Sequence, residues 1–183
     1  MKSILVTGGT GELGRVLVAA LLSSGQWDRI AVFANDEQRQ FAMQQEYIGN
    51  ETLRWFIGDV RDVERLKLAF DGVNHVVHTA EMRLERTGDR HPIEMVKTNI
   101  LGTQNVIDAA IERSVPNVLI VSSLDARNPT GVYGSTKLCA ERLALAANGE
   151  ATHFSITRVG YLATPMEVAS IILGCLHAVA AVA

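Results

Sequence analysis

The sequence predicts an α/β protein, a Rossmann-type doubly wound parallel sheet in a single domain. Three observations predict it: short apolar runs alternate with stretches of helical periodicity, a glycine triplet ends the first apolar run, and no linker or repeat divides the 183 residues. Strands joined through helices require right-handed crossovers and a parallel sheet. With the glycine loop directly after the first strand, the expected strand order is 3-2-1-4-5-6.

The first strand is expected at Ser3–Thr7, and the first helix near Glu12–Ser24. Between them, Gly8 permits a tight turn, Gly11 lets the backbone approach a pyrophosphate, and Gly14 lets helix and strand pack closely. The start of the helix adds N–H groups and the positive end of its dipole. A glycine triplet alone often marks only a bend, but after an N-terminal strand and at the start of a helix it predicts dinucleotide binding.

The later strands are expected where an apolar run precedes a helical pattern. We expect them at Arg29–Ala34, Leu53–Gly58, His75–His78, Asn117–Ser122 and His153–Arg158, with helices near Glu37–Tyr47, Val63–Phe70, Pro92–Glu112 and Tyr133–Asn148. A last helix should begin after Thr164, because Thr164-Pro165-Met166-Glu167 has the pattern of a capping box. The apolar run 168–183 is too short for a membrane span, so a core or interface helix is favoured over a membrane anchor.

Tyr133 and Lys137 are the first candidates for catalysis. They lie one helical turn apart, so both side chains project from one face. A lysine ammonium beside a phenol lowers the tyrosine pKa, which would make Tyr133 a general acid/base for a carbinol or carbonyl oxygen. Ser123, at the end of the fifth strand, could hydrogen-bond the same oxygen. Tyr-x-x-x-Lys occurs by chance on many helices, so the pattern counts only together with the glycine loop and the preceding serines.

Composition excludes some functions and favours one compartment. A net charge of -3 gives no reason to expect nucleic acid or an anionic membrane as partner. The five histidines form no metal-ligand spacing with each other or with Cys139 and Cys175, so no metal is expected. Both cysteines lie in apolar helical patterns typical of reduced core thiols. The chain runs from Met1 straight into the first strand without a separate signal region, which predicts a cytoplasmic protein.

Four segments together resemble the extended short-chain dehydrogenase/reductases: 7–11, 58–62, 97–106 and Tyr133 to Lys137. Within this superfamily, residues 56–62 and Asn128-Pro129 are similar to the inverting UDP-N-acetylglucosamine 4,6-dehydratase branch of polysaccharide biosynthesis. The likeness covers Ile4 to about Gly160. It implies an NAD(P)-dependent oxidoreductase or epimerase-type enzyme that acts on a nucleotide sugar, first of all a UDP-hexosamine, and forms homodimers or higher homo-oligomers.

The resemblance also assigns roles to residues. Ser123, Tyr133 and Lys137 match the catalytic triad, and Asn99 matches a helix asparagine that helps to place the lysine, with a polar surface residue as the alternative. Asp59 and Val60 would bound the adenine, and Lys137 would also hold the nicotinamide ribose. The residues expected to contact the cofactor are Gly8, Gly11, Glu12, Leu13, Gly14, Asn35, Arg39, Asp59, Val60, Thr79, Ala80, Tyr133 and Lys137.

Two departures from the branch concern its chemistry. The branch has Asp-Lys after its Ser-Thr pair, where this chain has Leu124-Asp125. Leucine can neither remove nor deliver a proton, and Asp125 could substitute only if the loop shifts by one position, so oxidoreduction or epimerisation is favoured over dehydration. The chain also passes from Gly160 almost directly to the late helix, so residues 1–183 are expected to form one NAD(P)-binding domain with the substrate lobe largely missing.

The third departure concerns the cofactor. Ala34-Asn35-Asp36-Glu37 replaces the branch's Ser-Arg-Asp-Glu, which removes the arginine that would bind a 2′-phosphate, although Arg39 is nearby. Because Ala34 carries no carboxylate to bond a ribose hydroxyl, NADP with Arg39 as phosphate partner is preferred, and NAD is the alternative. Asp36 is either a ribose acid or a helix N-cap. Two alternatives to an active enzyme remain: a non-catalytic NAD(P)-binding sensor or partner subunit, and a shortened form of a longer active parent.

Overall fold

A single parallel sheet of six strands forms the centre of the molecule in the computed structural model, which describes residues 1–83, 91–160 and 163–180. The strand order is β3-β2-β1-β4-β5-β6, and every pair is parallel, which confirms the predicted topology. The strands are β1 (Ser3–Thr7), β2 (Arg29–Ala34), β3 (Leu53–Ile57), β4 (His75–His78), β5 (Asn117–Ser123) and β6 (His153–Val159).

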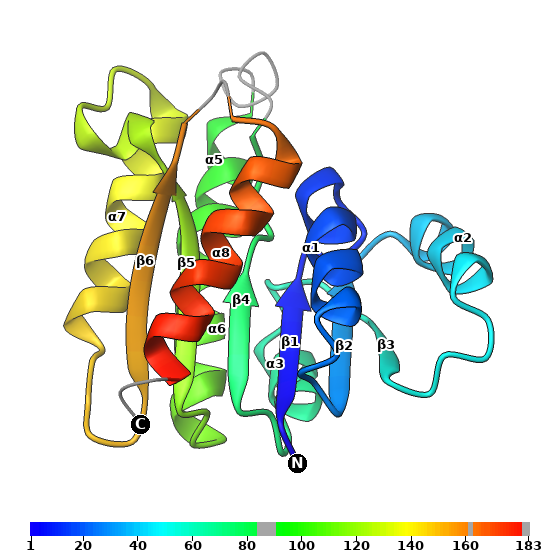
Figure 1. The fold of residues 1–183 in the computed structure, drawn as a ribbon. Helices are drawn as coiled ribbons and strands as arrows, with labels where there is room; N and C mark the ends of the chain where they lie inside the picture. The colour runs from blue at the N-terminus through cyan, green and yellow to red at the C-terminus, as the bar shows by residue number, and fades with distance from the viewer. Residues whose placement is uncertain (84–90, 161–162, 181–183) are drawn as a thin grey trace.

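Helices cover both faces of this sheet (Figure 1). They are α1 (Glu12–Ser23), α2 (Glu37–Glu46), α3 (Val63–Ala69), α5 (Pro92–Val96), α6 (Gly102–Glu112), α7 (Val132–Ala146) and α8 (Pro165–Ala180). The segment expected as one helix from 92 to 112 contains a π-helical stretch, η1 (Lys97–Leu101), between α5 and α6. A short 3-10 turn, η2 (Leu124–Arg127), follows β5.

Alternation along the strands divides the core into two layers. In β1, Leu5 packs with residues of α3 and α6, whereas Ile4 and Val6 pack with residues of α1 and α8. This is the pattern expected of a strand that is buried on both faces, because successive side chains point to opposite sides. The glycine loop at the end of β1 therefore lies between two packed layers.

Helix α8 lies beside α1 on the same face of the sheet (Figure 1). Val168 and Ile172 are buried in the core layer that contains α1. The capping box is confirmed: Thr164 N–H donates to Glu167 Oε2 at 2.8 Å, and Glu167 N–H donates to Thr164 Oγ1 at 3.3 Å. Among the described helices, none is long and apolar enough to cross a membrane.

Candidate active site

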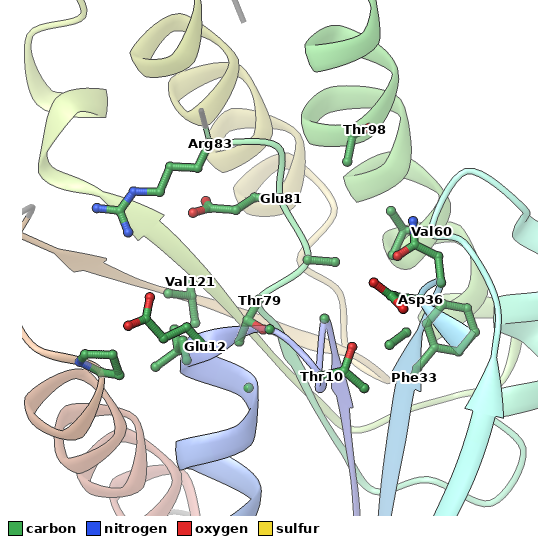
Figure 2. A pocket seen from close by; sticks show the side chains of 18 of the residues that line it. Thr10, Glu12, Phe33, Asp36, Val60, Thr79, Glu81, Arg83, Thr98 and Val121 are labelled. Carbon is green, nitrogen blue, oxygen red and sulfur yellow. The ribbon is translucent and has the colours of Figure 1, made fainter. Parts of the chain in front are cut away.

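A cavity of about 500 Å³ opens at the carboxyl ends of the strands. It lies where the strand order reverses between β1 and β4, the place at which doubly wound sheets bind their ligands. Figure 2 shows side chains from the ends of β1, β2 and β4 around it. Apart from Lys137, every residue expected at the cofactor lines this cavity, and Ser123 lines it too.

The glycine loop forms one wall of the cavity. Gly8 has a φ of +67°, and a Cβ there would lie 2.9 Å from the backbone N of Ala80, so a side chain would be both strained and obstructed. A Cβ at Gly14 would overlap the Gly8 carbonyl oxygen and lie 2.6 Å from Gly9 Cα. Gly11 is the N-cap of α1, which leaves the first N–H groups of the helix without a capping side chain. A close backbone and a helix start fit a pyrophosphate.

In the loop after β2, Asp36 caps the next helix. Its side chain accepts a hydrogen bond from Arg39 N–H at 2.9 Å and forms an ion pair with Arg39 Nε at 3.2 Å. Asp36 is therefore the N-cap of α2, one of the two roles that the sequence left open. Both side chains still line the cavity.

Asp59 is fixed at the end of β3 by Arg61, whose Nε and Nη2 donate to the two carboxylate oxygens at 3.0 and 2.7 Å. Hydrogen bonds from Arg61 hold the pKa of Asp59 below its ordinary value against the opposing effect of burial. Asn35 Nδ2 donates to Asp59 Oδ2 at 3.4 Å, which ties the ends of β2 and β3 together. These contacts shape the end of the cavity that lies over β2 and β3.

An ion pair between buried Glu141 and exposed Arg158 anchors helix α7, which carries Tyr133 and Lys137. Glu141 is 2% exposed, and it accepts hydrogen bonds from Ser122 Oγ at 2.6 Å and from Arg158 Nη2 at 2.6 Å. Burial alone would raise the pKa of Glu141, but the hydrogen bonds from Arg158 and Ser122 outweigh it and lower that pKa. The carboxylate thus joins α7 to β5 and β6, a contact that the sequence analysis did not identify.

A carboxylate from the β4 end reaches both Tyr133 and Lys137. Tyr133 Oη donates to Glu81 Oε2 at 3.0 Å, and Lys137 Nζ lies 2.9 Å from the same oxygen. Lys137 Nζ also donates to the Val121 carbonyl at 2.8 Å, and its side chain is 7% exposed behind the cavity wall. Glu81 could not be identified from the sequence, because nothing in the local pattern links it to a tyrosine 52 positions away.

The expected lowering of the tyrosine pKa by Lys137 is wrong in this arrangement. Burial raises the pKa of the Tyr133 phenol, and the negative charge of Glu81 raises it further, while Arg83 and the Ser123 hydroxyl oppose the shift. The physical reason is that the phenol is removed from water, and that its hydroxyl contacts the Glu81 carboxylate. Figure 2 shows Glu81 and Arg83 extending to the same side of the segment after β4.

Ser123 ends β5 and begins η2. Its Oγ donates to Asp125 Oδ2 at 2.7 Å and accepts from Asp125 N–H at 3.1 Å. Leu124, which stands in place of the acid of the related branch, has 53% of its surface exposed. The Asp125 carboxylate is therefore engaged with the serine hydroxyl.

His78 is buried at the end of β4 between two threonines. Thr103 Oγ1 donates its proton to the Asn99 carbonyl at 2.7 Å, so it must accept from His78 Nε2 at 3.0 Å. His78 Nδ1 is then the acceptor for the Thr7 hydroxyl at 2.7 Å. Burial, with a contribution from the Lys137 charge, lowers the pKa of His78 to about 3, so the ring is neutral.

Asn99 lies in η1 and is buried, so the alternative of a surface residue is wrong. Its Oδ1 accepts from Met82 N–H at 2.7 Å, and its Nδ2 donates to the Met82 carbonyl at 3.0 Å and to Thr136 Oγ1 at 3.1 Å. On α7, Asn99 bonds Thr136, the neighbour of Lys137, rather than the lysine itself. Asn99 thus ties the segment that carries Glu81 to helix α7.

No metal site is found among the described residues, since no three His, Cys, Asp or Glu side chains of that part of the chain converge on one point. Cys139 and Cys175 are free thiols and only half-buried. The cavity is lined by backbone, hydroxyl, carboxylate and cationic groups, by the phenol, and by apolar side chains such as Phe33, Val60 and Val168.

Comparison with known proteins gives one consistent family. Residues 4–165 match the family described as polysaccharide biosynthesis protein. A UDP-N-acetylglucosamine 4,6-dehydratase (inverting) from Campylobacter jejuni is 43% identical over 163 residues, which are 87% of this chain and 48% of that enzyme. A UDP-glucose 4-epimerase from Rickettsia rickettsii is 36% identical, over 87% of this chain and 48% of its own length.

Solved structures show the same fold. Pen from Bacillus thuringiensis superimposes with a TM-score of 0.82 and 38% identity, over 86% of this chain and 49% of that one. MoeE5 in complex with UDP-glucose and NAD has a TM-score of 0.71 and 26% identity, over 84% and 52%. The chain thus spans about half the length of the curated relatives and of these two structures.

Proposed function

The chain belongs to the polysaccharide biosynthesis protein family, within the extended short-chain dehydrogenase/reductases. From this premise we propose that it oxidises or epimerises a hydroxyl-bearing carbon of a nucleotide sugar with a nicotinamide dinucleotide. One observation carries the proposal: the glycine loop and Tyr133 face the same cavity. The glycine loop would bind the dinucleotide phosphates, and Tyr133 would exchange a proton with a substrate oxygen. Cofactor binding and proton transfer would therefore take place in one cavity.

In this proposal the glycine loop and the start of α1 bind the pyrophosphate, and the ends of β2 and β3 hold the adenosine. When bound, the dinucleotide supplies the acceptor for a hydride from the sugar carbon. Tyr133 exchanges the hydroxyl proton, and Ser123 lies beside the reacting oxygen. The relatives named for UDP-N-acetylglucosamine and UDP-glucose support a UDP-sugar as substrate, with a UDP-hexosamine first.

The proposed reaction is simple oxidation or epimerisation at C4, with little dehydration. Elimination of water needs a second acid or base at the leaving hydroxyl. Leu124 supplies none, and Asp125 is bonded to Ser123. Incubation with UDP-N-acetylglucosamine and cofactor, followed by mass spectrometry, tests this, because oxidation removes two hydrogens, epimerisation leaves the mass unchanged and dehydration removes water. Chromatographic separation of the C4 epimers identifies the unchanged mass.

We propose NADP as the preferred cofactor. Ala34 offers no carboxylate to the ribose, and that of Asp36 already caps α2, while Arg39 lines the cavity beside it. The NAD bound by MoeE5 makes NAD the competing assignment. Calorimetry with each dinucleotide decides between them, and Gly11→Val should abolish binding of both by placing a branched side chain against the pyrophosphate. No binding of either by the unmodified chain would remove the basis of the proposed function.

Tyr133→Phe is the sharpest test of catalysis, because it keeps the ring and removes only the transferable proton. We expect bound cofactor without turnover. If the unmodified protein binds cofactor but converts no nucleotide sugar, the alternative of a non-catalytic sensor or partner subunit replaces the enzyme.

We also propose self-association through α5, η1 and α7. Three apolar side chains of these elements are well exposed, Ile93 at 63%, Leu101 at 53% and Leu145 at 48%. Exposed apolar side chains on these elements favour burial against a second copy. Light scattering at micromolar concentration should report a dimer or larger species, and Leu101→Glu should shift it toward the monomer; a monomeric mass for the unmodified chain contradicts this part of the proposal.

A further inference from the structure

Glu81 occupies the position at which the groups of the proposed reaction meet. It follows β4 by three residues, lines the cavity and keeps 22% of its side chain exposed. A single oxygen, Oε2, accepts the Tyr133 proton at 3.0 Å and lies 2.9 Å from Lys137 Nζ. The carboxylate is thus in contact with the phenol that would receive the substrate proton.

A purely structural salt bridge would explain only part of this geometry. Lys137 is already held by the Val121 carbonyl, and Asn99 already ties the Glu81 segment to α7 through Met82 and Thr136. Neither contact needs the phenol to donate to Glu81. The bond from Tyr133 is therefore the feature that calls for a chemical explanation.

We propose that Glu81 is a catalytic residue, the acceptor to which Tyr133 passes its proton while the phenol takes the proton of the substrate hydroxyl. The inference rests on the proposed oxidation of a sugar hydroxyl. The substrate O–H bond breaks, and its proton bonds to Tyr133 Oη. The former phenolic proton bonds to Glu81 Oε2. The electron pair left on the substrate oxygen completes the carbonyl as the carbon releases its hydride to the nicotinamide dinucleotide, and the reverse transfers restore the hydroxyl.

The charges around the phenol support this relay. Burial and the Glu81 charge both disfavour a phenolate and raise the pKa of Tyr133. A neutral phenol that gains one proton as it loses another avoids that charge. Among the described residues, the cations that face the pair are Lys137, from α7, and Arg83, from the segment after β4. Asp125 reaches the site only through Ser123, and neutral His78 lies behind Lys137.

The first test uses the free protein and needs no turnover. Ultraviolet absorbance records phenolate formation as the pH rises, and Tyr133→Phe identifies the Tyr133 contribution. Glu81→Gln should lower the pH at which Tyr133 ionises by about one unit or more, because a negative neighbour is removed and Lys137 remains. Glu94→Gln, which changes an exposed carboxylate on α5, should leave the Tyr133 signal in place. An unchanged titration in Glu81→Gln would overturn the proposal.

The second test measures cofactor affinity and turnover together. Glu81→Gln should bind the dinucleotide as the unmodified protein does, and lose about 100-fold or more in kcat at neutral pH. Part of that loss should return at high pH, where Tyr133 ionises and becomes the base itself. Unchanged kcat overturns the role of Glu81, and increased kcat makes the contact an obstruction instead. If the unmodified protein shows no cofactor binding or no turnover, both the proposed function and the relay are refuted. If the unmodified protein turns over and Glu81→Gln has the same kcat, only the relay is refuted.

Discussion

The buried histidine at the end of β4 should make the protein sensitive to mild acid. His78 is 3% exposed, and both ring nitrogens bond neutral partners. Nδ1 accepts from the Thr7 hydroxyl, and Nε2–H donates to Thr103 Oγ1. A second ring proton would have to be held in a buried site near the charge of Lys137. Burial, with a contribution from that charge, lowers the pKa of His78 to about 3.

The sign and size of the effect follow from the two states of the chain. In the unfolded protein a histidine binds a proton as the pH falls through about 6.5, whereas folded His78 stays neutral until about pH 3. The unfolded state therefore binds more protons between these values, and the free energy of unfolding decreases as the pH is lowered through this window. Between pH 7 and pH 5 the loss from this one group is about 2 kcal/mol.

Urea unfolding at pH 7 and pH 5 measures this loss. His78→Gln removes the titration and keeps a side chain that can donate and accept, so its stability should fall by about 2 kcal/mol less than that of the unmodified protein. His153→Gln, at an exposed position, serves as the matched control. Burial also lowers the pKa of His75, but that contribution is common to all three proteins and cancels. Equal losses in His78→Gln and the unmodified protein would refute the reasoning, as would an NMR titration in which the His78 ring protonates near pH 6.

Other predictions concern packing and cofactor choice. Gly14→Ala should cost about 1–3 kcal/mol in thermal unfolding, since its Cβ would meet loop backbone, while Gly131→Ala, with open space around it, should cost little; similar costs for both would contradict the account of the loop. Glu141→Gln should destabilise the protein by about 1–3 kcal/mol in urea, because Arg158 loses its ionic partner, and an unchanged midpoint would show that the pair does not anchor α7. Arg39→Ala should lower the ratio of NADP to NAD affinity in calorimetry, and a constant ratio would remove Arg39 as the phosphate partner.

The fold could be predicted because its signals are local. The apolar runs, the glycine triplet and the capping box at Thr164 each lie within a few residues, and parallel crossover rules convert their order into a topology. The π-helical stretch at Lys97–Leu101 could not be predicted in this way. It lies inside one uninterrupted helical pattern, and what distinguishes it is tertiary: Asn99 turns inward to bond the backbone of Met82.

The prediction that the tyrosine pKa is lowered was wrong for the same reason. The spacing of Tyr133 and Lys137 correctly places both side chains on one helix face, and it would favour a phenolate if they were alone. Glu81 comes from the segment after β4, and it meets them because β4 lies beside β5, whose Val121 carbonyl accepts a hydrogen bond from Lys137. His78 is similar, since its two threonine partners are 71 and 25 residues away.

The position of the carboxylates also bears on the type of reaction. In the related dehydratase branch an acid directly follows the serine–threonine pair, whereas here that position is Leu124 and the next residue, Asp125, bonds to Ser123. The carboxylate that contacts Tyr133 comes instead from the segment after β4. Such a group can accept a proton through the phenol, and removal of a hydroxyl proton is the one proton transfer that oxidation or the first half of an epimerisation requires. Dehydration needs a second group at the leaving hydroxyl, so a carboxylate at the β4 end is consistent with the proposed oxidation or epimerisation.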